Sequence, residues 1–227
     1  MKKIALLFVA FLFAATCSLQ AQKQFVGEIQ FKTKMEGTDD PNLTSSIESM
    51  TSVTSILGNK SKTVQNFDGM YILTSIWNGD KETSTFLIEI NGLGKFYKKT
   101  TAEEHKNKLK LSEYSYNYVD EYKTICDYKC QRVDVTITNL EDDSTQEMVL
   151  YVTKEIGGGK ANGAELPGLD GFPLLTRVAL PQYCEECVMA SEAIKITPKK
   201  IKDVDFLLPD DAKNIDDDPE LKEKLGL

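Results

Sequence analysis

From Phe25 onward, apolar and polar residues alternate in short stretches, and turn-forming residues interrupt these stretches about every ten residues. A period of two predicts strands with one buried face, and regular interruptions are typical of an antiparallel meander. Residues 70–77 and 81–90 are two such predicted strands, and Asn78-Gly79-Asp80 lies between them. Asn78 and Gly79 favour a tight hairpin turn there, because both residue types tolerate positive φ.

Five further strands extend the predicted sheet. The first places Phe25, Ile29 and Phe31 on one face. The other four are expected to form a consecutive up-and-down meander at Gln131–Thr138, Glu147–Thr153, Phe172–Leu180 and Val188–Thr197. The alternation predicts that the inward side chains are Val133, Val135 and Ile137 in the first of these four, and Val188, Ala190, Ile194 and Ile196 in the last.

Two segments have a helical period instead. In residues 45–57, apolar side chains recur every three to four residues, Ser45 with Glu48 fits a capping box, and Gly58 can end the last turn. The apolar residues of this predicted helix are Ile47, Met50, Val53 and Leu57. A short helix is also predicted at residues 218–226, starting at Asp218-Pro219, with Leu221 and Leu225 as its apolar stripe.

Together these elements predict a mainly β fold of the α+β type, with residues 22–227 as a single domain. The expected architecture is a curved antiparallel sheet, a half-open β-barrel, with the helix at residues 45–57 packed on its concave side. That arrangement lets the inner face of the sheet and the apolar face of the helix cover each other.

The first 21 residues have the character of a signal peptide. Two lysines precede an unbroken apolar run from Ile4 to Ala15, and the small residue Ala21 is a suitable cleavage site. A lipoprotein signal with acylated Cys17 is the alternative. We therefore expect a periplasmic, secreted or outer-membrane-associated protein without a transmembrane span in its mature form.

Charge narrows the range of partners. The chain has 27 basic and 35 acidic residues, and removal of Lys2 and Lys3 with the signal peptide would change the net charge from -8 to -10. An acidic protein of this kind is repelled by nucleic acid and by anionic membranes. Binding to nucleic acid is therefore not expected.

Four cysteines occur as two close couples, in "ICDYKC" and "QYCEEC". An exported protein meets an oxidising compartment, and the predicted meander places Cys130 and Cys187 at opposite ends of the sheet. Local disulfides are therefore predicted, Cys126–Cys130 and Cys184–Cys187. Zinc bound by four thiolates remains an alternative, as does a redox couple, although Glu185 and Glu186 would raise the thiol pKa in "CEEC".

Other residue types offer weaker candidates. Tyr114, Tyr116 and Tyr118 alternate, so a strand would present their rings on one face, either as a wall for an apolar ligand or a sugar, or as cross-strand packing. His105 is expected to be an ordinary surface residue in a charged segment, and the Gly-rich residues 157–171 a mobile flap over one rim of the sheet. No catalytic residue, metal site or cofactor is expected.

Several stretches resemble a known group of proteins in the same order along the chain. They are "FVGEIQFK", "EYKTICDYKC", "LPGLDGFPLLTRV" and "IKDVDFLLP". They resemble uncharacterised exported cell-envelope proteins with a GLPGLI-type motif, a domain of unknown function similar to the LolA/LolB-like lipoprotein-localisation superfamily. The resemblance implies a half-open barrel closed by helices, and a lipid or other apolar ligand in the concave sheet. It implies no catalytic residue.

Three functions remain open from the sequence. The leading hypothesis is a non-enzymatic envelope protein that binds a lipid, an acyl chain or another apolar ligand. The second is a structural or interaction protein that docks onto an envelope partner and holds no small molecule. The third is a thiol-disulfide enzyme.

Overall fold

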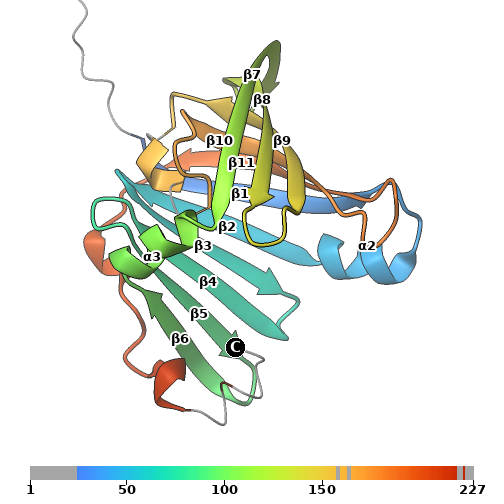
Figure 1. The fold of residues 1–227 in the computed structure, drawn as a ribbon. Helices are drawn as coiled ribbons and strands as arrows, with labels where there is room; N and C mark the ends of the chain where they lie inside the picture. Colours follow the sequence, from blue (N-terminus) through green and yellow to red (C-terminus); the bar gives the residue numbers. More distant parts are fainter. Residues whose placement is uncertain (1–24, 157–158, 163–164, 219–221, 223–227) are drawn as a thin grey trace, which may run out of the picture.

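The structure is a computed structural model that describes residues 25–156, 159–162, 165–218 and 222. Its described strands form one sheet in the order β12-β6-β5-β4-β3-β2-β1-β11-β10-β9-β8-β7 (Figure 1). All neighbours are antiparallel except β12 and β6, which are parallel. The strands are β1 (Val26–Glu36), β2 (Met50–Leu57), β3 (Lys60–Phe67), β4 (Tyr71–Asn78), β5 (Thr83–Ile90), β6 (Gly94–Thr100), β7 (Ser112–Ile125), β8 (Tyr128–Asn139), β9 (Thr145–Thr153), β10 (Phe172–Ala179), β11 (Val188–Pro198) and β12 (Lys213–Asn214).

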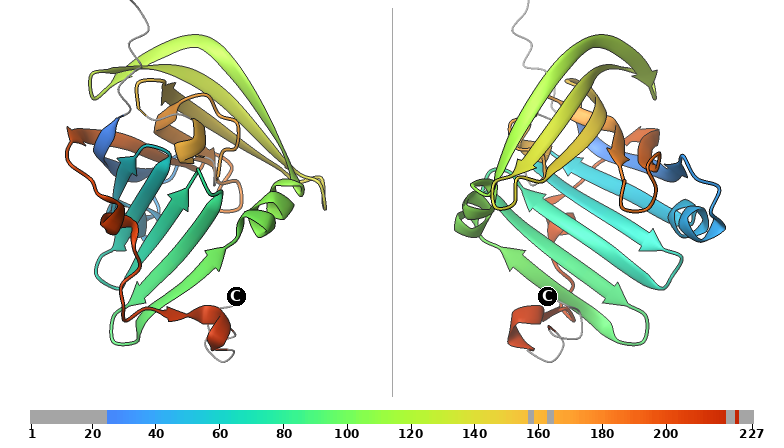
Figure 2. Two further views of the ribbon diagram at one scale, coloured as in Figure 1. Left: turned by 90° about the vertical axis from the view of Figure 1, so that its left-hand side faces the viewer. Right: turned by 45° about the vertical axis from the view of Figure 1, so that its right-hand side comes forward.

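The sheet is strongly curved and not closed. Figure 2 shows β2–β6 and β7–β10 as two halves that face each other, and the strand order places β1 and β11 between them. Strands β7 and β12 are the two edges. The prediction of a curved, antiparallel, mainly β fold is therefore confirmed, and so are the meander from β8 to β11 and a hairpin between β4 and β5. The predicted tight turn at Asn78-Gly79 is wrong in its form, because Asn78 pairs with Thr83 and four residues connect them, with the positive φ at Glu82.

The predicted helix at residues 45–57 is wrong. A shorter helix, α2 (Pro41–Glu48), ends before that segment is half complete, and Met50–Leu57 is strand β2. Side chains of β2 are buried at every second position, Ser52, Thr54 and Ile56. The β-branched residues in this stretch favour the extended backbone over the helix, and pairing with β1 and β3 fixes it.

The last strand of the meander contains a bulge that the alternation did not reveal. Gln30 of β1 is opposite Lys195, whereas Phe31 is opposite Ala193, so Ile194 has no partner in this register. The extra residue changes which side chains point inward beyond it. Ile194 is therefore 59% exposed and Ala193 is buried, contrary to the predicted inward position of Ile194.

The concave side holds a loop and not the predicted helix. Residues 155–171 connect β9 to β10 and include the short 3₁₀ helix η1 (Gly159–Asn162). Ile156 belongs to the main apolar cluster with Ile29 and Ile56, and Leu166 and Leu169 pack on the inner side chains of β8 and β9. Helix α2 instead contacts β1 and β2 at one end of the sheet (Figure 1).

The C-terminal segment covers the opposite, convex face. Lys199, Lys202 and Leu207 line a groove there with Val53 and Lys62, and the Nζ of Lys62 donates to the carbonyl of Asp205 at 2.9 Å. Along the chain, this segment contains η2 (Asp203–Phe206), then β12, and then η3 (Ile215–Asp217). The predicted signal peptide and nearly all of the predicted helix at 218–226 lie outside the described residues. Within the described part of the chain, no helix has the length and apolar character needed to cross a membrane.

Candidate functional site

A cavity of about 250 Å³ lies between the inner face of the sheet and the loop at residues 155–171. Because side chains alternate along a strand, β2, β3 and β4 present small polar residues to it at every second position. Thr54, Thr63 and Ser75 are direct cross-strand neighbours in this order. We call this cavity the polar hollow; its lining side chains include Ser52, Thr54, Ser61, Thr63, Gln65, Ser75, Trp77, Glu165, Thr176 and Ser191.

The loop is fastened to the wall of the polar hollow. The Nε1 of Trp77 donates to the carbonyl of Lys160 at 2.6 Å, and the Oγ of Ser61 donates to the carbonyl of Ala161 at 3.0 Å. The Nδ2 of Asn162 donates to the carbonyl of Gly171 at 2.5 Å, which ties η1 to the end of the loop next to β10. Residues 157–171 were predicted to form a flap over one rim of the sheet. The predicted location is wrong, because the described residues of this loop lie inside the concave side.

Some polar groups of the hollow are satisfied within the protein, and others face its interior. The hydroxyls of Thr54 and Thr63 are 2.9 Å apart, and that of Thr33 donates to Ser191 at 3.2 Å. A second set makes no side-chain hydrogen bond within the described part of the chain; it comprises Ser52, Gln65, Ser75, Thr176 and Glu165. Ser52 is only 7% exposed, so its hydroxyl is accessible mainly to a group that enters the hollow.

Glu165 is the one ionisable side chain among the described residues that line the polar hollow. Protein surrounds it on most sides, and this desolvation raises the pKa of its carboxyl above the ordinary value of 4.5. Water still reaches part of this side chain, so the carboxyl is desolvated but not sealed from solvent. A protonated carboxyl has one O–H to donate and keeps acceptor capacity.

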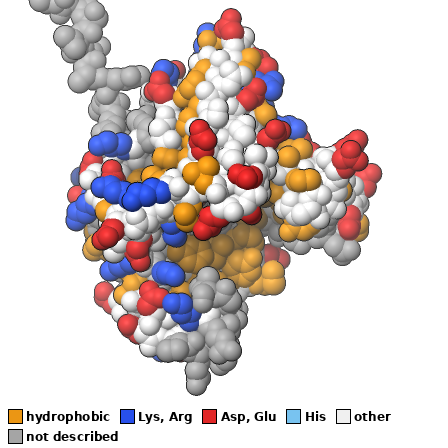
Figure 3. Space-filling view, in the orientation of Figure 1, with side chains coloured by type: hydrophobic (Ala, Val, Ile, Leu, Met, Phe, Trp, Pro, Cys, Tyr) orange, Lys and Arg blue, Asp and Glu red, His pale blue; other side chains and the backbone are white. Residues whose placement is uncertain are grey.

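The inner face becomes apolar farther along β3, β4 and β5. Gln65 is opposite Leu73, which is opposite Ile88, and Ser75 is opposite Phe86. Figure 3 shows hydrophobic side chains gathered on a hollowed surface over these strands. We call this surface the apolar zone; its residues are Phe67, Tyr71, Leu73, Phe86, Ile88 and Ile90.

The apolar zone is open to solvent although its side chains are large. Phe86 is 37% exposed, and Leu73 and Ile88 are only partly buried. The rings of Phe67 and Tyr71 stack with their centroids 4.4 Å apart. Because Leu73 and Phe86 directly adjoin Gln65 and Ser75, the polar hollow and the apolar zone form one continuous surface.

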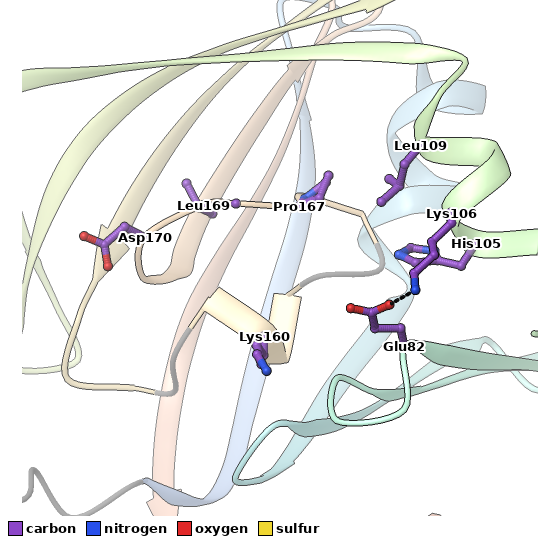
Figure 4. A pocket seen from close by; sticks show the side chains of 9 residues that line it. Glu82, His105, Lys106, Leu109, Lys160, Pro167, Leu169 and Asp170 are labelled. Atoms are coloured by element: carbon purple, nitrogen blue, oxygen red, sulfur yellow. Dashed lines mark ion pairs between the residues drawn. The ribbon is translucent and has the colours of Figure 1, made fainter. Parts of the chain in front are cut away.

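A second cleft of about 590 Å³ lies on the other side of the loop, between α3 (Ala102–Leu109) and residues 167–170 (Figure 4). Thr101 caps α3 by accepting a hydrogen bond from the backbone of Glu104, whose carboxylate accepts one in return from the Thr101 N–H at 2.7 Å. Lys106 and Glu82 form an ion pair at 3.3 Å across the cleft wall. Its lining is mostly apolar.

His105 lies at this cleft but is not the surface residue that the sequence predicted. It is buried, with 7% exposure, and its ring centroid is 4.8 Å from that of Trp77. The charged neighbours of His105 point outward because α3 packs only one face against the sheet. The prediction of an exposed position is therefore wrong, and long-range packing against β4 is the reason.

The tyrosines alternate on β7 as predicted, and two of them bind the loop. The hydroxyl of Tyr116 donates to the carbonyl of Pro167 at 3.0 Å, and that of Tyr118 accepts from the N–H of Asp170 at 2.9 Å. Burial, with a smaller contribution from Tyr114 and Tyr118, raises the pKa of Tyr116. These contacts position the loop, while a role of Tyr114, Tyr116 and Tyr118 in ligand binding stays a prediction.

The Cys184–Cys187 disulfide is confirmed, with Cα atoms 5.1 Å apart, and those sulfurs are not available to a metal. The predicted Cys126–Cys130 bridge is wrong, because both thiols are free. Cys126 and Asp127 form the two-residue turn between β7 and β8 with φ of 47° and 70°, and Cys130 is opposite Lys123. At about 3.3 Å per residue, Cys130 lies about 10 Å from Cys126, beyond the roughly 7 Å that a disulfide allows.

The free thiols are poorly suited to chemistry. Burial raises the pKa of Cys130 to about 11, and burial, with the nearby Asp127 and Glu192, raises that of Cys126. A reactive cysteine needs a lowered pKa. Among the described residues, no group of three or more His, Cys, Asp or Glu side chains is arranged to hold a metal ion.

Sequence reasoning missed the polar hollow. The signal was present: Ser52-x-Thr54, Ser61-x-Thr63-x-Gln65 and Ser75-x-Trp77 place polar residues at alternate positions on what became the inner face. Nothing local distinguishes such a polar row from a solvent-facing one. Only the closure of the loop over the row makes it a cavity.

Comparison with known proteins shows a similar fold. No protein-family model matches the chain, and no curated protein matches it in sequence. Two crystal structures of PNGF-II, in space groups P21 and C2, superpose with TM-scores of 0.52 and 0.53 at 13% identity. The matched region covers 84% of this chain but only 31% of the PNGF-II chain, so this protein matches about a third of PNGF-II. The similarity concerns the fold alone, and the resemblance to GLPGLI-type and LolA-like proteins stays a prediction.

Proposed function

We propose that the protein is a non-enzymatic binding protein of the cell envelope that holds the apolar part of a ligand, such as an acyl chain, on the apolar zone. The observation that carries the proposal is this partly exposed row of large apolar side chains on a concave surface. Exposed apolar surface of this kind favours ligand or partner binding, because water is released when it is covered. Burial of about six methylene groups would contribute roughly 5 kcal/mol before the entropy costs of binding.

The cellular location is part of the proposal. The N-terminal sequence favours export, and a disulfide at Cys184–Cys187 is typical of proteins from oxidising compartments. A thiol enzyme is disfavoured, since Cys184 and Cys187 are bonded to each other and the thiols of Cys126 and Cys130 have raised pKa values.

A displacement assay tests the proposal. The protein is titrated with 1-N-phenylnaphthylamine, a probe that fluoresces in apolar surroundings, and the probe is then displaced with octanoate and decanoate. We expect Phe86→Asp to weaken probe binding at least tenfold, because it places a charge in the centre of the apolar zone. The matched control is Leu207→Asp, an exposed apolar residue (65%) on the convex face, which should leave binding unchanged. Equal binding by both variants and the wild type, or no binding by any of them, would refute the proposal.

An interaction protein without a small ligand is the second candidate. Met70 and Leu93 are 66% and 69% exposed at the β3–β4 and β5–β6 turns, next to the apolar zone. Exposed apolar tips of this kind favour docking to a partner. A Met70→Ser/Leu93→Ser double variant that keeps probe binding but loses an envelope partner in cross-linking would support this candidate.

A further inference from the structure

The lining of the polar hollow has a chemical character that the proposed function does not use. Five side chains face the cavity without a hydrogen-bond partner in the described part of the chain: Ser52, Gln65, Ser75, Thr176 and Glu165. They come from β2, β3, β4, β10 and the loop, so they surround the cavity from several sides. Each hydroxyl is both donor and acceptor, and the Gln65 amide supplies one group of each kind.

The charge of the hollow disfavours anionic headgroups. No lysine or arginine lies among its described lining residues, so a phosphate or carboxylate would find no cation and would face Glu165. For a cationic group, Glu165 is the one possible ionic partner among the described lining residues. A neutral group that carries several hydroxyls needs no ionic partner, since each of its hydroxyls can replace its bonds to water with bonds to the lining.

Apolar side chains complete the lining. Phe31 and Phe172 border the hollow beside the polar groups, and the indole of Trp77 is fixed through its N–H. Sugar rings have polar edges and apolar C–H faces, and a cavity that combines hydroxyls with aromatic walls matches both.

We infer that the polar hollow binds a neutral saccharide ring through Ser52, Gln65, Ser75, Thr176 and Glu165. The inference rests on the proposed function in one respect: the hollow adjoins the apolar zone at Gln65 and Ser75, so the whole surface fits an amphiphile with a sugar headgroup and an alkyl chain. A free sugar and a glycolipid share the headgroup chemistry, and the experiment distinguishes them.

The test compares headgroups and chains separately. The probes are the octyl glycosides of glucose, galactose and mannose, the matching methyl glycosides, and octylphosphocholine, all below their micellar concentrations. Binding is measured by calorimetry and by the fluorescence of Trp77, the only tryptophan in the chain, which lines the hollow. We expect the affinity of at least one octyl glycoside to be at least ten times that of octylphosphocholine. It should also be at least ten times that of the methyl glycoside with the same sugar.

Two variants assign the effects. Gln65→Leu with Ser75→Ala should weaken the octyl glycoside at least tenfold and leave octylphosphocholine unchanged, since it removes polar groups only from the hollow. Phe86→Asp should weaken both octyl ligands by similar factors. The control is Thr85→Val, a polar-to-apolar change on the opposite face of β5, which should change neither affinity.

The outcomes separate the inference from the proposed function. If octylphosphocholine binds as tightly as every octyl glycoside and the Gln65/Ser75 variant changes nothing, the saccharide inference is overturned while the apolar zone stands. If a methyl glycoside binds as tightly as its octyl form and Phe86→Asp has no effect, the proposed function fails and the saccharide inference stands. No binding of any probe overturns both.

Discussion

Gly79→Ala tests directly whether the loop is seated in the concave side. A Cβ at Gly79 would lie 2.3 Å from the carbonyl oxygen of Lys160 and 2.8 Å from that of Asn59, and both are backbone atoms. No positive φ is involved at this position, so alanine is compatible with the local backbone. The substitution therefore acts through the contact between the β4–β5 turn and η1, and the loop must move.

Two effects set the magnitude. Forcing an extra methyl group into a packed contact costs about 1–3 kcal/mol. Displacement of Lys160 also breaks its 2.6 Å hydrogen bond with the Trp77 indole, which is worth about 0.5–1.5 kcal/mol. We therefore expect the free energy of unfolding to fall by roughly 2–4 kcal/mol.

Urea unfolding and intrinsic fluorescence measure the result. Trp77 is the only tryptophan and is 5% exposed, so its emission reports on the loop directly. We expect the emission of native Gly79→Ala protein to shift to longer wavelength as water replaces the loop. Gly69→Ala is the control: no atom lies within 4 Å of its added Cβ, and its φ of 74° costs only about 1–2 kcal/mol. An unchanged emission and an unfolding midpoint equal to wild type for Gly79→Ala would refute the insertion of the loop.

Three further predictions concern stability. Glu165→Gln should stabilise the protein at pH 7 and not at pH 3.5 in urea unfolding, because a raised native pKa means that folding stability falls as the pH rises through and above 4.5. A gain of equal size at both pH values would contradict the desolvation of this carboxyl. Thr101→Ala should lower the free energy of unfolding by about 1 kcal/mol through loss of the α3 cap, and a neutral effect in thermal melts would argue against that cap. Cys184→Ala with Cys187→Ala should cost about 2 kcal/mol for a ring of this size, and mild reduction of the wild type should reproduce the loss; no difference between reduced and oxidised protein would speak against the bridge.

Strands β1, β4, β5 and β8 to β11 could be predicted because their information is local. Alternation with a period of two is visible in any five to eight residues, and the turn-forming residues after Asn78 mark the hairpin between β4 and β5. The three-residue separation of Cys184 and Cys187 likewise allows a bridge within one turn. Residues 45–57 show the limit of this approach. The apolar residues at the end of α2 and in β2 happen to be three to four positions apart, which is the spacing of a helix.

The site depended on contacts that no local pattern encodes. His105 is buried because α3 meets Trp77 on β4, and Ile194 points outward because β1 and β11 pair with a bulge. Cys130 is far from Cys126 because the hairpin turn places it on the opposite strand. In each case the deciding partner is distant in sequence or depends on the strand register.

By itself, the sequence determined that this chain builds a mainly antiparallel sheet, that β8 to β11 follow one another in it, that the chain is acidic, and that Cys184 and Cys187 can form a short disulfide. Only the tertiary structure decided that the loop between β9 and β10, in its described residues, lies in the concave side of the curved sheet. The physical reason is that the position of a residue in its strand decides on which face of the sheet its side chain lies. Whether that face meets water, protein or an enclosed space depends on the curvature of the sheet and on the packing of the loop. Thr54, Thr63 and Ser75 would be an ordinary polar row on an open sheet, and here they line a cavity.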